Sequence, residues 1–143
     1  MLNKFIKFIG NNFGNPGGIA GKISVKIMNV MNQKQYKAIL DNINLEHNDI
    51  LLDIGFGNGY LMNKLFEKNI QINIYGIEIS NYMVNNVSKK YKKYVENGYL
   101  KLLLENIANT SFENGTFNKI YTINTIYFWN DLEKCFSEMY CLC

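Results

Sequence analysis

The stretch Leu51-Leu52-Asp53-Ile54-Gly55-Phe56-Gly57-Asn58-Gly59-Tyr60-Leu61 determines the expected fold of this 143-residue chain. Consecutive apolar side chains up to Ile54 are typical of a parallel strand that is buried on both faces. Glycines at positions 55, 57 and 59 predict a tight loop, after which a helix is expected to begin near Tyr60. The G-x-G-x-G spacing differs from the dinucleotide-binding G-x-G-x-x-G, because Tyr60 stands where the third glycine would be. The loop also lacks the Lys-Ser/Thr pair of a P-loop, and Asp53 would repel a phosphate, so a ligand with an ammonium group fits better. A tight turn without any ligand is the alternative.

A second strand-like segment, residues 72–80, carries another carboxylate near its end. Glu78 lies 25 positions after Asp53, close to the interval of about 20 residues at which a ribose-binding acid follows a glycine loop. One carboxylate can accept hydrogen bonds from both hydroxyls of a ribose. Glu78 is therefore a candidate ribose ligand, the alternative being an ordinary surface glutamate after a strand. Ser80 is expected to be the N-cap of the next helix.

Together with residues 100–112 and 117–124, these segments resemble the motifs of class I S-adenosylmethionine-dependent methyltransferases, in particular small-molecule enzymes of the methyltransferase type 11 group. The resemblance covers about residues 12–140. Asn106 stands where the family has an aspartate that contacts the adenine amine, and Asn118 replaces a second aspartate. For Asn106, solvation in a loop is the alternative role. The resemblance implies S-adenosylmethionine as cofactor, S-adenosylhomocysteine as product, and as cofactor-binding residues Asp53, Gly55, Gly57, Gly59, Glu78, Ile79, Asn106, Ile107 and Asn124.

The chemistry of methyl transfer makes few demands on catalytic side chains. It is an in-line displacement from a sulfonium, whose positive charge already activates the leaving group, so the protein mainly aligns the reactants and excludes water. We therefore assign no catalytic residue and no metal ligand. Tyr127 and Trp129 follow the fourth expected strand and are candidates for the substrate side, either framing the sulfonium by cation–π contact or lining a substrate pocket. Packing against the last helix is the alternative for both.

The methyl acceptor is expected to be a small molecule rather than a nucleic acid. The sequence contains no arginine, which is the residue that most often makes specific contacts to bases. Position 124 onwards reads Asn-Thr-Ile-Tyr, unlike the Asn/Asp-Pro-Pro-aromatic motif of enzymes that methylate the amino groups of DNA bases. The chain also has no Pro-Cys pair, which cytosine-ring enzymes use as nucleophile. The lysines at 89, 90, 92 and 93 are expected to lie on a solvated helix face.

The order of elements predicts an α/β protein with a Rossmann-like parallel sheet. The resemblance implies the strand order 3-2-1-4, with helices on both sides. Residues 1–45, which are rich in lysine, are expected to form a basic helical lid or cover, and residues 46–143 an incomplete cofactor-binding domain. Strands are expected at residues 49–54, 72–78, 100–104 and 117–123, and helices at 60–69, 80–96 and 131–140.

The family domain normally continues with three more strands, so we expect the last strands of the fold to be missing. The edge of strand 117–123 would then be exposed, which favours pairing with another chain, including a second copy. Two other functions stay open: a catalytically inactive cofactor-binding remnant or half of an assembly, and, less well supported, a nucleotide-linked oxidoreductase.

The composition of the chain limits the expected class of protein and its expected cellular compartment. The formal net charge is +3, and no apolar run is long enough to span a membrane. The N-terminus lacks the apolar core of a signal peptide. Cys135, Cys141 and Cys143 have no metal-binding spacing and are expected to be reduced thiols. We therefore expect a cytoplasmic protein without a metal site and without stable membrane insertion.

Overall fold

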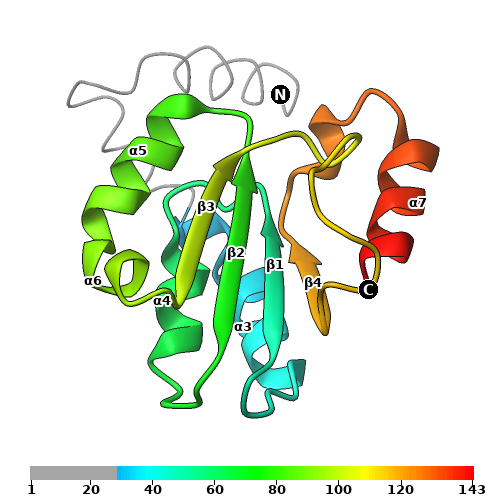
Figure 1. Ribbon diagram of the computed structural model, residues 1–143. Helices are drawn as coiled ribbons and strands as arrows, with labels where there is room; N and C mark the ends of the chain where they lie inside the picture. Colours follow the sequence, from blue (N-terminus) through cyan, green and yellow to red (C-terminus); the bar gives the residue numbers. More distant parts are fainter. Residues whose placement is uncertain (1–28) are drawn as a thin grey trace.

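A computed structural model describes residues 29–143 of the protein. Four parallel strands form a single sheet in the order β3-β2-β1-β4, as expected (Figure 1). The strands are β1 (Ile50–Ile54), β2 (Asn73–Glu78), β3 (Leu100–Leu104) and β4 (Lys119–Thr122). The two central strands, β1 and β2, therefore have neighbours on both sides, and β3 and β4 are the edges of the sheet.

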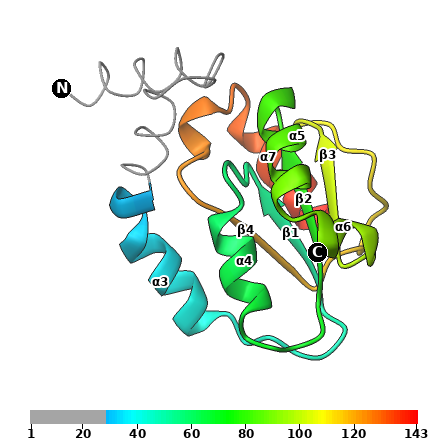
Figure 2. The same ribbon diagram turned by 90° about the vertical axis from the view of Figure 1, so that its left-hand side faces the viewer.

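Helices cover both faces of the sheet and separate the core into two layers. The first layer packs Leu51 of β1 and Ile74 of β2 against the helices that precede β3, and the second packs Leu52 and Ile77 against the last helix and the segment before β4. Figure 2 shows α3 and α4 next to each other on one side of the sheet. The helices are α3 (Gln33–Asn42), α4 (Tyr60–Phe66), α5 (Asn81–Lys90), α6 (Lys92–Glu96) and α7 (Leu132–Leu142), with a 3-10 turn η1 (Ile126–Phe128).

The helix expected at residues 80–96 is in fact two helices, and the expectation of one helix was wrong. Tyr91 has φ −111° and ψ 31°, which ends α5 and starts α6 in a new direction. The change of direction places Tyr94 against Phe66 of α4, with the two rings stacked 4.1 Å apart. Stacking of these two rings adds to the apolar burial. The sequence also predicts Tyr82, with Val84, Val87, Tyr91 and Tyr94, on the buried side of this segment, but Tyr82 is exposed and Met83 is buried instead.

Of the N-terminal segment expected at residues 1–45, the structure describes only residues 29–45. The spacing of Ile19, Ile23, Ile27, Val30 and Met31 in the sequence predicts one packed face of a helix, but Val30 and Met31, the two that the structure describes, are both exposed. Tyr36, Ile39 and Leu40 of α3 do pack against the first core layer, as their spacing predicts. The helical pattern from Gly18 to residue 28 lies outside the described residues.

The end of α7 is tied to the segment that enters β4. The Gly115 amide donates to the Cys141 carbonyl at 2.9 Å, and the Phe117 amide donates to the Leu142 carbonyl at 3.0 Å. These bonds satisfy carbonyl groups that a helix end leaves without partners. The helix consequently runs to Leu142, slightly beyond the residue 140 expected from sequence.

Candidate functional site

The predicted cofactor residues gather at the carboxyl ends of the parallel strands. Asp53 is the penultimate residue of β1, and Glu78 is the last residue of β2. Residues 55–59 form the loop from β1 to α4, and residues 123–129 follow β4. This edge of the sheet is where ligands of open α/β folds bind.

The glycines at 55 and 57 have different structural roles. Gly55 has φ +72°, and a Cβ there would lie 2.3 Å from Cγ2 of Thr125, so a side chain cannot be accommodated. Its amide donates to the Ile77 carbonyl at 2.8 Å. Gly57 has φ +53°, and a Cβ there would meet no atom within 4 Å among the described residues. Gly55 is therefore required by packing, whereas Gly57 leaves open space above the main chain.

Gly59 joins the loop to two helices. It is the N-cap of α4 with φ +70°. A Cβ there would lie 2.8 Å from the side chain of Val87 in α5 and 2.8 Å from that of Tyr91, which ends α5. The loop therefore packs directly on α5. Phe56 between the glycines is buried in the first core layer, as expected for a packing residue.

Glu78 binds the glycine loop through its carboxylate. Its Oε2 accepts a hydrogen bond from the Gly57 amide at 3.2 Å, and its Oε1 accepts from the Ile79 amide at 2.9 Å and the Ser80 amide at 3.3 Å. Ser80 is the N-cap of α5, as predicted, and accepts from the Met83 amide. Ile79 beside it is 68% exposed, an unusual position for an isoleucine. Glu78 thus holds the loop that follows β1, and Asp53 lies in β1 just before this loop.

Asp53 is a buried carboxylate. Only 5% of the residue is exposed, and its partners in register are Gly76 on β2 and Tyr121 on β4. Burial raises the pKa of Asp53 to about 8; the Tyr121 hydroxyl opposes this shift, and the negative charge of Glu78 adds to it. A neighbouring cation would favour the ionised form.

The segment after β3 presents a polar and an apolar side chain in opposite directions. The Asn106 side chain is exposed and accepts a hydrogen bond from the Ala108 amide at 2.9 Å. Ile107 is buried in the second core layer. Any ligand contact by Ile107 would therefore come from its main chain.

Asparagines connect the start of α3 to two loops of the site. Asn124 has φ +57° and donates through Nδ2 to Oδ1 of the buried Asn32 at 2.6 Å. Asn58 in the glycine loop donates to Oδ1 of Asn29 at 2.8 Å. Sequence reasoning missed Asn29, Asn32 and Asn58, because asparagine is so abundant in this chain that no single one stands out.

The two aromatic candidates for the substrate side differ. Tyr127 is 72% exposed. Trp129 packs in the second core layer and makes an edge contact with Phe136 of α7, with ring centroids 5.6 Å apart. Trp129 therefore packs against the last helix, which was the alternative role for both residues. Of the two, Tyr127 is the one whose side chain is exposed and can contact a ligand.

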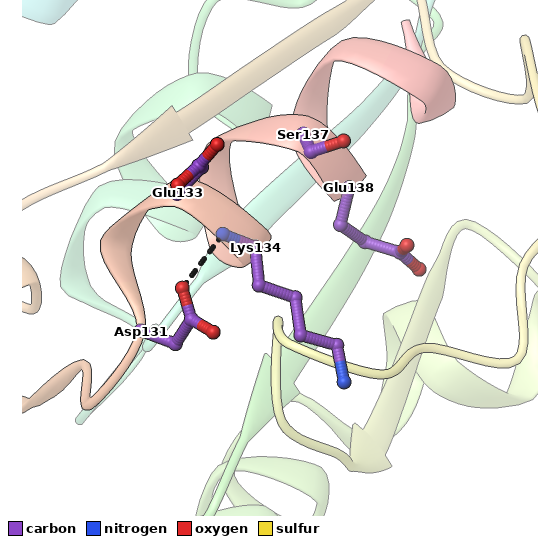
Figure 3. A pocket seen from close by; sticks show the side chains of 5 residues that line it. All are labelled: Asp131, Glu133, Lys134, Ser137 and Glu138. Atoms are coloured by element: carbon purple, nitrogen blue, oxygen red, sulfur yellow. Dashed lines mark hydrogen bonds between the residues drawn. The ribbon is translucent and has the colours of Figure 1, made fainter.

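A shallow groove runs along the start of α7, and none of the candidate site residues lines it. It is lined by five polar side chains, and Asp131 caps the helix by accepting from the Lys134 amide at 2.9 Å (Figure 3). Within residues 29–143, no three His, Cys, Asp or Glu side chains are grouped as a metal site would need. His47 is exposed, as expected, and no helix in the described part of the chain has the length and apolarity to cross a bilayer.

Comparison with known proteins decides the family. Residues 52–143 match the family model described as a methyltransferase domain. The chain belongs to this methyltransferase family. One curated relative is the uncharacterized methyltransferase YdaC of Bacillus subtilis, which is 24% identical to this chain over 114 residues. These residues are 80% of this chain and 61% of YdaC. The chain therefore spans less than two thirds of the length of that relative.

Solved structures show the same fold for this methyltransferase chain. Phosphoethanolamine N-methyltransferase 2 of Haemonchus contortus, solved with S-adenosyl-L-methionine, matches with a TM-score of 0.67 and 21% identity over 76% of this chain and 25% of its own. The [4+2]-cyclase SpnF matches with a TM-score of 0.68 and 14% identity over 76% of this chain and 40% of its own. Since a cyclase shares the fold, the fold alone does not specify the reaction.

Proposed function

We propose that this chain binds S-adenosylmethionine and transfers its methyl group to a small-molecule acceptor. The observation that carries the proposal is a pair of carboxylates at one glycine loop: Asp53 lies just before the loop in β1, and Glu78 accepts a hydrogen bond from the Gly57 amide within it. No atom of residues 29–143 fills the space above Gly57, so a ligand can lie against the main chain there.

Each carboxylate suits a different part of the cofactor. Asp53, buried next to the loop, would take the ammonium group of the methionine part or its ordered waters. Glu78 has the two acceptor oxygens that a ribose diol requires. The exposed Ile79 offers an apolar surface for the adenine, and the Asn106 amide offers a hydrogen bond to it. The remaining proposed cofactor contacts are Gly55, Gly57, Gly59, Ile107 and Asn124.

When bound, the cofactor supplies an activated methyl group on its sulfonium. The side chains of the protein are then required to hold the reactants in line and to exclude water. Tyr127, exposed after β4, is the proposed contact to the acceptor. The acceptor is proposed to be small because the chain lacks arginine. We further propose a cytoplasmic location, where free thiols such as those of Cys135, Cys141 and Cys143 stay reduced.

We propose residues 1–45 as a cover of the site, and residues 46–143 as the cofactor-binding part. The support comes from Asn29 and Asn32, whose side chains bond to the loop after β1 and the loop after β4. The chain before α3 therefore contacts both sides of the proposed cofactor position.

Calorimetric titration with S-adenosylmethionine and S-adenosylhomocysteine tests the proposal. Saturable binding is expected, and Asp53→Ala and Glu78→Ala should each weaken it. Glu96→Ala is the matched control, because this exposed glutamate forms a surface pair with Lys92. A folded wild-type chain that binds neither compound would refute the proposal.

A second function is favoured by the open edge of β4 and by the surface of α7. Leu132, Phe136 and Tyr140 recur every four residues on α7 and are all exposed. The chain would then be an inactive cofactor-binding remnant, or half of an assembly that pairs through this edge. Turnover by a monomeric chain, established by sedimentation at the assay concentration, would exclude this second function.

A further inference from the structure

Tyr121 has a hydroxyl group that the packing of the core does not explain. The residue is only 8% exposed, and its hydroxyl oxygen is fully buried without a hydrogen-bond partner among residues 29–143. A phenylalanine would fill the same space without burying an unsatisfied polar group, which is costly. The hydroxyl therefore requires a role.

The sheet register brings this hydroxyl to Asp53. Strands β1 and β4 are parallel neighbours, and Asp53 and Tyr121 are direct partners in their register. Side chains of register partners point to the same face of a sheet. Tyr121 packs in the first core layer, so Asp53 lies on that face too.

Two other titratable side chains that act on Asp53, Glu78 and Tyr36, offer it no free donor. Glu78 from β2 carries a negative charge, which disfavours a second one nearby. Tyr36 from α3 donates its hydroxyl to Asn29 at 3.4 Å, and its ring lies against that of Tyr60 from α4, with centroids 4.8 Å apart. Tyr121 is thus the nearby hydroxyl that is free to donate to Asp53.

The protonation state of Tyr121 supports this role. Burial, followed by the charge of Asp53, raises the pKa of the Tyr121 phenol well above its usual value. The phenol therefore keeps its proton and remains a donor. A hydrogen bond to the ionised form of a carboxyl group stabilises that form.

We propose that Tyr121 is a positioning residue of the cofactor site: when Asp53 ionises, the Tyr121 hydroxyl donates to its carboxylate, which favours the ionised form and orients it for the ammonium group of the cofactor. The inference rests on the proposed function. It gives the core residue Tyr121 of β4 a role in ligand binding. In the proposed function, this part of the chain contributes only through the loop that follows β4.

Carboxyl ¹³C NMR of the ligand-free protein tests the contact between the two groups directly. The Asp53 resonance is assigned by its loss in Asp53→Asn and is titrated in wild type and in Tyr121→Phe. Removing the hydroxyl should raise the Asp53 midpoint by about one pKa unit. Tyr75→Phe is the matched control, since Tyr75 is also a strand tyrosine but packs in the other core layer. An unmoved midpoint in a folded Tyr121→Phe variant would overturn the inference.

Titration with S-adenosylhomocysteine supplies the second readout. At pH 7, Tyr121→Phe should bind about tenfold more weakly than wild type, and the deficit should shrink at a pH above the Asp53 midpoint of the variant. A deficit that is equal at every pH would indicate a merely structural defect and would refute the role of Tyr121 alone. A wild-type chain without any affinity would instead refute the proposed function, and the positioning role with it.

Discussion

At the scale of single residues, Asp53 and Asp49 show how the position of a carboxylate sets its chemistry. Both are buried. Burial raises the pKa of Asp53 to about 8, the phenol of Tyr121 opposes this shift, and the negative charge of Glu78 adds to it. For Asp49 burial also acts to raise the pKa, but hydrogen bonds from Lys119 and the Glu46 amide, with the charge of Lys119, lower it below its usual value. One carboxylate is ready to respond to a cationic ligand, and the other is structural.

Asp53 should make the empty protein less stable as the pH rises. Because its pKa is higher in the folded than in the unfolded chain, its contribution is fully present below about pH 4 and is lost as the pH rises toward and through 8. The free energy of unfolding should fall by about 3–4 kcal/mol between pH 5 and pH 8 from this group. Urea denaturation over this range measures the fall. Asp53→Asn should flatten the profile, and an equally steep profile in this variant would contradict the raised pKa.

Lys119 should be important for stability although it lies on an edge strand. Its Nζ is 2.5 Å from Oδ2 of the buried Asp49. Lys119→Met should lower the free energy of unfolding by about 2 kcal/mol, because it leaves a buried carboxylate without its partner. The matched control is Lys37→Met, which breaks an exposed pair with Asp41 and should leave the urea midpoint unchanged. Equal effects of the two substitutions would show that Asp49 is solvated.

At the scale of elements, two glycines distinguish the effect of backbone strain on stability from the effect of a lost ligand contact on binding. One of them, Gly57, lies in the loop from β1 to α4. Gly57 and Gly115 both have positive φ, and a Cβ at either position would meet no described atom. Alanine at each should cost a similar amount of stability, about 1 kcal/mol. Only Gly57→Ala should weaken S-adenosylhomocysteine binding, by about tenfold or more, because its methyl group would occupy the space proposed for the ligand. Calorimetric titration of both variants measures this difference. Equal affinities of the two variants for S-adenosylhomocysteine would show that the ligand does not lie against Gly57.

The elements themselves were largely predictable from the sequence. Consecutive apolar residues before a glycine loop identified β1, and the repeated pattern of strand, acid and helix identified β2 and α5. The break at Tyr91 was not predictable, since no glycine or proline marks it and it depends on the contact of Tyr94 with Phe66 on α4. Tyr82 was misassigned for a different reason: it adjoins Met83, and Met83 is the residue that lies one turn before Val87 on the buried face of α5.

The candidate site was predictable only in part. The carboxylates and glycines have characteristic spacing, but the contacts of Asn29, Asn32 and Tyr121 depend on packing between segments that are distant in sequence. Tyr121 does carry one readable signal. It is the penultimate residue of β4, as Asp53 is of β1, so alignment of the strand ends would have paired them.

At the scale of the whole molecule, the surface around β4 and α7 predicts self-association for the assembly function. Tyr140 is 87% exposed and belongs to the apolar row on α7. Sedimentation velocity should show a rising fraction of dimer with protein concentration, and Tyr140→Lys should reduce it because a charge then enters the contact. Val30→Lys is the control, since Val30 is exposed on a different segment. A wild-type chain that stays monomeric at every concentration would exclude the assembly.

The three amides bound to Glu78 have a consequence for how a nucleoside can bind. In the empty protein this carboxylate already accepts from Gly57, Ile79 and Ser80, so a ribose diol must exchange with main-chain donors that are in place. The gain from Glu78 is then a difference between two sets of hydrogen bonds, not the full value of either. Binding would release the Gly57 amide, which should exchange its hydrogen faster with solvent unless the ligand itself accepts from it. Occupation of this site would thus loosen the centre of the glycine loop while the ligand itself becomes ordered.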